Sequence, residues 1–232
     1  WRVAVGARRE DRLAETAEQV EAAGGRVFAH RLDVTDADSV RACFDASERA
    51  LGTVEVLVAN AGIAVPGPLA DLDPADIQRV FDTNVVGAAL CARQAVRRWR
   101  AAGSENGDRV FISSETAERP WPHNVAYSAS KVALEHVARG LRMELDGTGA
   151  RVSIVQLGPA ESEFGFGFPP ERMAEALAAW QEARVWTHWA MMTPEQVARA
   201  VVFATTAPRG LEVHDVVVKP TPPRAPTPTP SS

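Results

Sequence analysis

Tyr127 and Lys131 are the two residues whose types and spacing most directly suggest chemistry. Tyr127 is the only tyrosine of the chain, and Lys131 is one of two lysines among 25 basic residues. Positions i and i+4 lie on one face of a helix. A nearby ammonium favours the phenolate over the phenol, so we expect Lys131 to lower the pKa of Tyr127 from its usual value of about 10. Such a pair can act as a general acid–base.

The scarcity of both residue types argues against the alternative, an incidental pair on an exposed helix. Arginine carries nearly all the positive charge of the chain, and lysine differs from it as a compact point charge. Ser114 ends the apolar run VFISS and precedes the tyrosine, so its hydroxyl is a candidate for holding a substrate oxygen. Ser113 is the alternative candidate on position alone.

Strand and helix patterns alternate along the chain, and the elements that they predict must position these residues. Apolar runs predict strands over 2–7, 26–34, 54–60, 108–114, 151–158 and 211–220. Spacing and end signals predict helices over 10–23, 36–51, 74–102, 124–146 and about 194–206. The runs 2–7, 54–60 and 108–114 are predicted to be buried strands, and 159–193 is predicted to be less regular. The alternation indicates an α/β, Rossmann-like, doubly wound parallel sheet flanked by helices.

The carboxyl ends of the strands are where ligands bind in such a sheet. The residues that follow the predicted strands are therefore candidate site residues: Arg8, Asp33, Asn60, Ser114 and Gly158. Aromatic residues gather farther along the chain, at Phe164, Phe166, Phe168, Trp180, Trp186 and Trp189. They would suit an apolar or cyclic substrate, and plain packing is the alternative.

Size and composition restrict the class of protein. The 232 residues, 46% hydrophobic and 24% charged, fit one domain over 1–219 with a Pro-rich, disordered tail over 220–232. A net charge of −5 argues against nucleic acid as a partner. No apolar stretch suits a membrane span, no signal-peptide pattern is present, and no spacing predicts a metal site. Cys43 and Cys91 form no disulfide pattern, so we expect a reducing, cytoplasmic location.

Together these residues resemble the compact type of short-chain dehydrogenase/reductase, from Trp1 to about Pro220. The matching segments are Asp33-Val34, NAG at Asn60–Gly62, TNVVG with Asn84, Ser114, YSASK with Tyr127 and Lys131, and LGPAESEF from Leu157. Each motif is weak by itself, but their order and spacing together are highly specific. Leu157 departs from the proline that is usual in this family at that position.

The resemblance implies hydride transfer between a nicotinamide cofactor and a small ketone or alcohol. Tyr127 would exchange the proton with the substrate oxygen, and Lys131 would lower the tyrosine pKa and hold the nicotinamide ribose. Ser114 would position the substrate oxygen, and Asn84 would hold a water that links Lys131 to solvent. Besides Tyr127 and Lys131, the implied cofactor contacts are Asp33, Val34, Asn60, Ala61, Gly62, Gly158 and Ser162. The resemblance also implies a homodimer or homotetramer.

Arg8 and Arg9, which follow the first predicted strand, indicate NADP(H) rather than NAD(H). A carboxylate at that position binds the ribose hydroxyls of NAD, whereas arginine suits a 2′-phosphate through charge-assisted hydrogen bonds. Arg8 is the stronger candidate. The alternative is a solvated pair that opens a helix, although cations are slightly unfavourable at a helix N-terminus.

The first predicted strand matches the second strand of this family. We therefore expect a strand, a glycine-rich turn that binds the pyrophosphate and a helix to precede it, so that the given chain is N-terminally truncated. In the order 3-2-1-4-5-6 the missing strand is central, and its loss would divide the sheet. The alternative to an active oxidoreductase is thus an inactive fragment or a non-catalytic interaction protein that keeps the fold. An extended-type epimerase is disfavoured because no separate substrate domain is present.

Overall fold

The computed structural model describes residues 1–104, 107–162 and 169–222. Its strands are β1 (Arg2–Ala7), β2 (Arg26–Arg31), β3 (Val56–Ala59), β4 (Gly107–Ser114), β5 (Ala150–Leu157) and β6 (Asp215–Val218). Its α-helices are α1 (Glu10–Ala22), α2 (Ala37–Leu51), α3 (Pro74–Phe81), α4 (Ala88–Ala101), α5 (Val125–Glu144), α6 (Pro170–Glu182) and α7 (Pro194–Thr206). The short elements η1 (Leu69–Asp71) and η3 (Glu115–Ala117) are 3-10 turns, and η2 (Asp82–Gly87) is π-helical.

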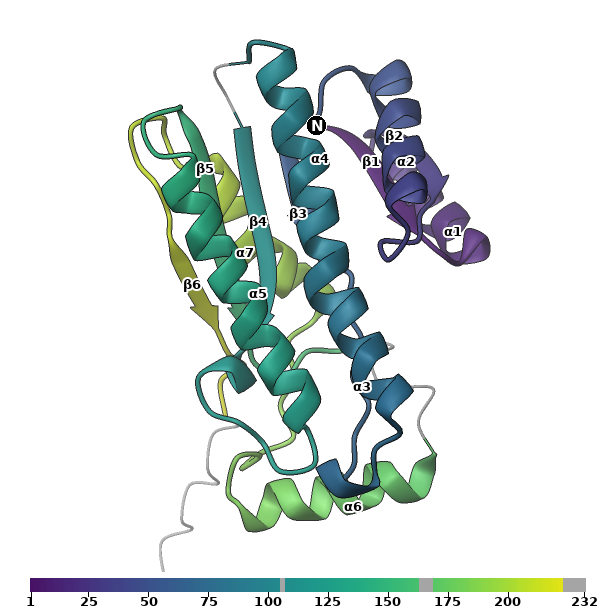
Figure 1. Cartoon of the computed structure of the whole chain (residues 1–232), viewed down its shortest axis with the longest axis vertical. Helices are drawn as coiled ribbons and strands as arrows, with labels where there is room; N and C mark the ends of the chain where they lie inside the picture. The colour runs from purple at the N-terminus through teal and green to yellow at the C-terminus, as the bar shows by residue number, and fades with distance from the viewer. Residues whose placement is uncertain (105–106, 163–168, 223–232) are drawn as a thin grey trace, which may run out of the picture.

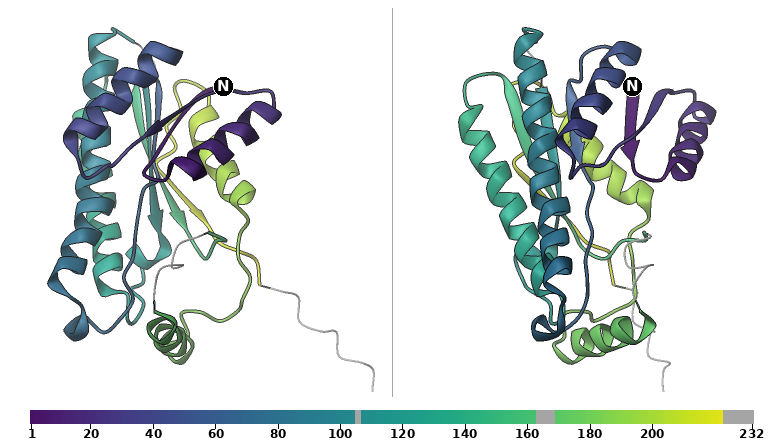
Figure 2. Two further views of the ribbon diagram at one scale, coloured as in Figure 1. Left: turned by 90° about the vertical axis from the view of Figure 1, so that its right-hand side faces the viewer. Right: turned by 45° about the vertical axis from the view of Figure 1, so that its right-hand side comes forward.

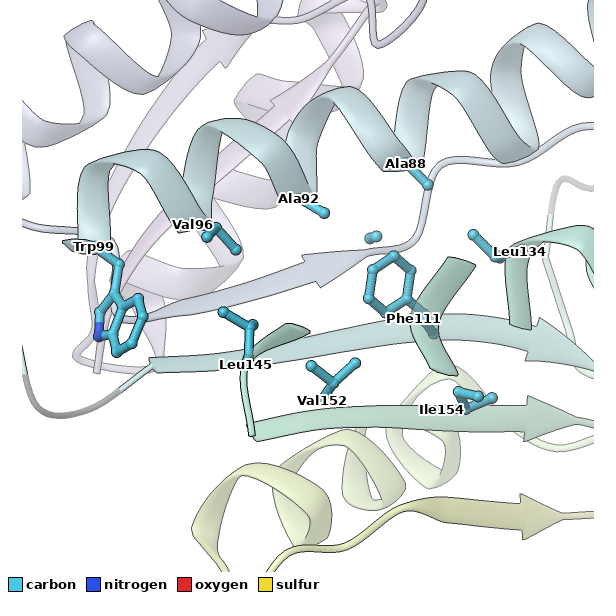
Figure 3. Packing of buried hydrophobic residues seen from close by; sticks show 11 residues of the cluster. Ala88, Ala92, Val96, Trp99, Phe111, Leu134, Leu145, Val152 and Ile154 are labelled. Atoms are coloured by element: carbon cyan, nitrogen blue, oxygen red, sulfur yellow. The ribbon is translucent and has the colours of Figure 1, made fainter. Parts of the chain in front are cut away.

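All strand pairs of the described chain are parallel, which confirms the predicted α/β class. Helices α4 and α5 cover one face of the larger sheet and α7 covers the other (Figures 1 and 2). Between α4, α5 and the sheet lies the main core, in which Phe111 of β4 is fully buried among residues of both helices and of β5 (Figure 3). This core holds α5 in place across the sheet, and α5 carries Tyr127 and Lys131.

The strands form two sheets in the described residues, because no ladder joins β1 to β3. One sheet has the order β1-β2, and the other has the order β3-β4-β5-β6. They correspond to the two groups that lie on either side of the first strand in the order 3-2-1-4-5-6, with one more strand in the larger group than that order has. The division of the sheet that the sequence predicts is therefore confirmed.

The predicted burial of two strands is wrong. No residue of β1 is buried, and Val58 of β3 is 41% exposed. The reason is the division of the sheet, since β1 and β3 each lack a neighbouring strand on one side. An apolar run such as VEVLVAN predicts a strand correctly, but its burial depends on strands and helices elsewhere in the fold.

The smaller sheet is attached to the rest of the molecule through helices. Helix α2 packs on α4, where Phe44 contacts an apolar cluster that includes Cys91. At the edge of this contact Arg98 forms ion pairs with Asp45 at 2.5 Å and with Glu48 at 2.6 Å. Side-chain packing and half-exposed ion pairs replace the backbone hydrogen bonds that would join a continuous sheet.

We expect the backbone amides of β1 to exchange with solvent at least ~100-fold faster than those of β4, because opening of β1 disrupts fewer buried contacts. β1 pairs with β2 alone, whereas β4 is flanked by β3 and β5. Hydrogen exchange followed by mass spectrometry on peptides that cover 2–7 and 107–114 measures the difference. Equal protection of the two segments would contradict the divided sheet.

Three further elements differ from the sequence-based expectations. The segment 159–193 contains α6, whose run of alanine and glutamate favours a helix although the wider segment is rich in aromatic residues. The predicted helix 74–102 contains the π-helical turn η2, and such turns are frequent at functional sites. The last strand is shorter than predicted, at Asp215–Val218. No helix among the described residues has the length and apolar character that a membrane crossing requires.

Candidate active site

Four of the candidate residues meet at the carboxyl end of the larger sheet. Ser114 is the last residue of β4, Tyr127 and Lys131 lie on the first turns of α5, and Asn84 lies in η2. All four side chains are buried, with Asn84 fully enclosed and Lys131 only 4% exposed. The connection between the end of β4 and the start of α5 begins with η3 and runs from Glu115 to Asn124.

Tyr127 is a buried phenol with a raised pKa. Burial raises the pKa to about 12, and a side-chain hydrogen bond with Ser114 acts in the opposite direction. The Lys131 Nζ lies over the tyrosine ring, 5.5 Å from its centroid. The predicted net lowering of this pKa is therefore wrong, because the cost of burying a phenolate outweighs the hydrogen bond with Ser114. At neutral pH Tyr127 holds its proton.

Lys131 is a buried ammonium held by a strand. Its Nζ donates a hydrogen bond of 2.9 Å to the Ile112 carbonyl oxygen of β4. Burial lowers the pKa of Lys131 to about 8, and the charge of Glu135 opposes this. The lysine is thus a group that changes charge slightly above neutral pH.

The pleat of β4 decides between the two serines. The Ser113 Oγ donates to the Glu135 Oε1 at 2.7 Å, on the side of the strand that packs against α5. The Ser114 Oγ accepts hydrogen bonds from the Thr116 backbone N–H at 3.2 Å and from the Thr116 hydroxyl at 3.1 Å, and it also pairs with Tyr127. Ser114, and not Ser113, therefore shares a site with the tyrosine.

Asn84 joins the loop after β3 to helix α5. Its Oδ1 accepts from the Ile63 backbone N–H at 2.8 Å, and its Nδ2 donates to the Ile63 carbonyl and the Ser130 Oγ, both at 2.9 Å. A Cβ on Gly62 would lie 3.4 Å from the Asn84 Oδ1 and 3.5 Å from the Lys131 Nζ. The NAG segment therefore reaches the lysine, as its place after a strand predicts.

The proposed adenosine-side residues lie at the ends of β1 and β2. Arg8 is exposed, and Arg9 precedes α1 as its N-cap residue. The Asp33 Oδ1 accepts from the Thr35 backbone N–H at 3.0 Å and from the Thr35 hydroxyl at 2.7 Å. These hydrogen bonds lower the pKa of Asp33, and the charge of Arg8 lowers it further. Asp33 thus also has the turn-forming role that precedes a helix, and it shares its edge of the small sheet with Arg8.

The other candidate residues are dispersed along the same edge. Val34 packs so closely on η2 that a Cβ on Gly87 would lie 2.6 Å from its Cγ2. Asn60, Ala61 and Ser162 are exposed. Gly158 is buried, and its backbone N–H donates to the Val218 carbonyl at 2.9 Å.

The aromatic residues of the segment after β5 pack on each other in the described part. The rings of Trp180 and Trp186 stack with centroids 5.5 Å apart, and Trp121 meets Trp180 edge-on at 5.0 Å. The Trp180 Nε1 donates to the Pro122 carbonyl at 2.6 Å. This contact ties α6 to the loop between Ser114 and Tyr127. Phe164, Phe166 and Phe168 lie outside the described residues.

Sequence reasoning missed two members of this neighbourhood, Ser130 and Glu135. Ser130 accepts from Asn84 and donates to the Tyr127 carbonyl at 2.7 Å. Glu135 lies one helical turn after Lys131, so the same i, i+4 spacing that identified the Tyr–Lys pair could have identified it. Among the described residues, no group of three or more His, Cys, Asp or Glu side chains is arranged to hold a metal ion.

Comparison with known proteins gives the same family as the motifs. A family model of short chain dehydrogenases matches residues 1–167. Cis-4-hydroxycyclohexanecarboxylate dehydrogenase of Sinomonas cyclohexanicum is 36% identical over 190 residues, which are 82% of this chain and 73% of that protein. Sulfoacetaldehyde reductase 2 of Chromohalobacter salexigens is 31% identical over 224 residues, which are 95% of this chain and 85% of that protein.

Solved structures show the same fold. A metagenomic short-chain oxidoreductase in complex with NADP has a TM-score of 0.75 and 26% sequence identity to this chain. The match covers 95% of this chain and 86% of the other. The family model spans more than half of the chain, and two dehydrogenase or reductase relatives exceed 30% identity over most of it. The chain therefore belongs to the short-chain dehydrogenase family of oxidoreductases.

Proposed function

We propose that this chain is an NADP(H)-dependent oxidoreductase that interconverts a carbonyl group and a secondary alcohol. The observation that carries the proposal is a buried Tyr127 that bonds to Ser114 and has the Lys131 ammonium over its ring. A nicotinamide cofactor supplies or accepts the hydride when it is bound. The residues of the chain orient the reactants and move the proton.

Tyr127 is the proposed proton donor and acceptor. With a pKa of about 12 it holds a proton at neutral pH, which is the state that carbonyl reduction requires. During reduction the phenol O–H donates its proton to the carbonyl oxygen as that oxygen gains negative charge. The Ser114 hydroxyl donates a hydrogen bond to the same oxygen, and the Lys131 ammonium stabilises the resulting phenolate.

The site fits the nicotinamide end of the cofactor. Gly62 lies beside Lys131, since a Cβ at this position would be 3.4 Å from the Asn84 Oδ1 and 3.5 Å from the Lys131 Nζ. This closeness of the NAG segment to the ammonium supports a ribose held by Lys131. Arg8 would bind a 2′-phosphate, and the NADP complex of a relative with 26% identity supports the same cofactor. Within the described residues no glycine-rich turn leads directly from a strand into the next helix, so we assign no ligand to the pyrophosphate.

A second candidate is a chain that keeps this fold and lacks cofactor binding. The observation that favours it is the divided sheet, since the pyrophosphate of a dinucleotide binds beside the central strand in this type of fold. The two candidates differ in one measurable property. The oxidoreductase binds NADPH, and the interaction protein does not.

We expect carbonyl reduction to be constant below about pH 8 and to fall above it. Lys131 has a pKa of about 8 and loses its charge there, whereas Tyr127 keeps its proton up to about pH 12. Alcohol oxidation should instead rise with pH, because Tyr127 must act as a base in that direction. The measurement is kcat/KM in both directions across pH. A reduction rate that rises steadily toward alkaline pH would contradict the assignment of Tyr127 as the acid.

A substrate panel tests the proposed function. The panel includes 4-oxocyclohexanecarboxylate and sulfoacetaldehyde, which are the carbonyl compounds that the names of two relatives imply, together with simple aliphatic ketones. NADPH consumption is followed by nicotinamide absorbance, and NADPH binding is followed by its fluorescence. We expect binding and consumption with at least one carbonyl. Absence of both would leave the second candidate as the better account of this chain.

A further inference from the structure

Glu135 is a buried carboxylate in the contact between α5 and the larger sheet. Its side chain is 5% exposed. Its Oε1 accepts hydrogen bonds from the Ser113 hydroxyl and the Gln156 Nε2, both at 2.7 Å, and its Oε2 accepts from the Arg139 Nη2 at 2.9 Å. Every one of these partners acts as a donor, and only an ionised carboxylate is an acceptor at both oxygens. The contacts therefore hold Glu135 as an anion.

The carboxylate and the Lys131 ammonium lie against consecutive residues of one strand. The Lys131 Nζ binds the carbonyl oxygen of Ile112, and the Glu135 Oε1 binds the hydroxyl of Ser113. The two side chains also start one turn apart on the same face of α5, where Cβ atoms are about 5–6 Å apart. The hydrogen-bond partner of the ammonium in the described chain is a neutral carbonyl, and the charge that acts on the ammonium is that of Glu135.

Glu135 is the buried negative charge beside the lysine. The titratable groups that α5 brings to this contact are Tyr127, Lys131 and Arg139, and the partners from β4 and β5 are neutral, at Ser113 and Gln156. On β6, Asp215 reaches Arg139 at 4.0 Å and is 43% exposed. Arg139 is 44% exposed, so solvent screens its charge more than that of Glu135.

We propose that Glu135 is a positioning residue, which keeps Lys131 in its ammonium form and anchors it beside Tyr127 through the shared strand β4. Burial of an ammonium without a nearby anion favours the neutral amine. The pKa of Lys131 of about 8 lies close to neutral pH, so loss of this anion moves the lysine across the physiological range. The electrostatic part of the inference concerns Lys131 itself, and its effect on catalysis rests on the proposed function.

The scarcity of lysine makes a direct test possible. Lysine labelled with ¹³C at Cε gives signals from two residues only, Lys131 and Lys219. The Lys219 side chain is 52% exposed and pairs with Glu115, so it serves as an internal reference. In Glu135→Gln we expect the pKa of Lys131 to fall by at least about one unit relative to the unmodified chain, and the signal of Lys219 to titrate unchanged.

Arg139→Gln is the matched control, because it removes one partner of Glu135 and keeps the carboxylate. We expect the pKa of Lys131 to stay the same or to rise in this variant, since a cation has been removed. Circular dichroism checks the fold of both variants. Should Glu135→Gln fail to fold, Glu135→Leu in the Arg139→Gln background removes the anion without leaving an unpaired guanidinium, and the same fall is expected. An unchanged titration of Lys131 in a folded variant without the carboxylate would overturn the proposal.

Activity separates this inference from the proposed function. In Glu135→Gln we expect the rate of carbonyl reduction to begin to fall at a pH at least about one unit lower than in the unmodified chain. In Glu135→Asp we expect a smaller displacement of the pH profile, because this variant keeps the negative charge. A merely structural role would lower activity at all pH values equally, and that result would overturn the inference. Absence of turnover in the unmodified chain would overturn the proposed function alone, since the lysine titration tests Glu135 without catalysis.

Discussion

Tyr127→Phe is expected to reduce turnover by about 10²- to 10⁴-fold, the range that a positioned general acid–base contributes. The phenylalanine fills the same buried space and lacks the hydroxyl that would donate the proton. Loss of the hydrogen bond with Ser114 should lower the free energy of unfolding by about 0.5–1.5 kcal/mol, so the variant should remain folded. NADPH binding should be largely retained.

Ser128→Ala is the control for this variant. Ser128 follows Tyr127 on α5 and is also buried, but its Oγ has no hydrogen-bond partner among the residues that the structure describes. We expect turnover within about twofold of the unmodified chain, because removal of an unpaired buried hydroxyl costs little. Steady-state kinetics and chemical denaturation measure both variants. Retained turnover in Tyr127→Phe would refute its role as the acid.

Arg8→Asp is expected to change the preference for NADPH over NADH by about 10²-fold, measured as the ratio of the two kcat/KM values. The guanidinium is exposed at the end of β1, where it would pair with a 2′-phosphate. An aspartate would repel that phosphate and would bind ribose hydroxyls instead. The change therefore acts on the two cofactors in opposite directions.

Arg49→Asp makes the same change in net charge in the last turn of α2, where Arg49 is exposed, at the amino end of the strands and not at their carboxyl end. We expect this control to leave the cofactor ratio within about twofold, because a surface charge at the opposite end of the strands is screened. An Arg8→Asp variant with an unaltered ratio would contradict NADP(H) selection by Arg8.

Much of this structure could be predicted from the sequence because its elements follow local rules. Apolar runs and helical spacing identify the parallel α/β class, and strand ends identify the edge at which Ser114, Tyr127 and Lys131 meet. The spacing of Tyr127 and Lys131 correctly predicts a shared helix face. These features depend on neighbours within a few residues along the chain.

Features that depend on distant parts of the chain could not be predicted in the same way. The choice between Ser113 and Ser114 required the pleat of β4 and the position of Glu135 on α5. The direction of the pKa shift of Tyr127 required the extent of its burial, which outweighs the hydrogen bond with Ser114. Val58 is partly exposed because β3 is an edge strand of its sheet in the described residues, and not because of its own residue type.

Transfer of deuterium to a ketone from NADPH that carries deuterium at both C4 positions of the nicotinamide tests most directly whether this chain catalyses hydride transfer. We predict an alcohol that carries deuterium at its carbinol carbon, detected by NMR or mass spectrometry, and at least about 10²-fold less of it with Tyr127→Phe. An alcohol without deuterium, or equal labelling by the unmodified chain and Tyr127→Phe, would contradict an oxidoreductase that works through this tyrosine.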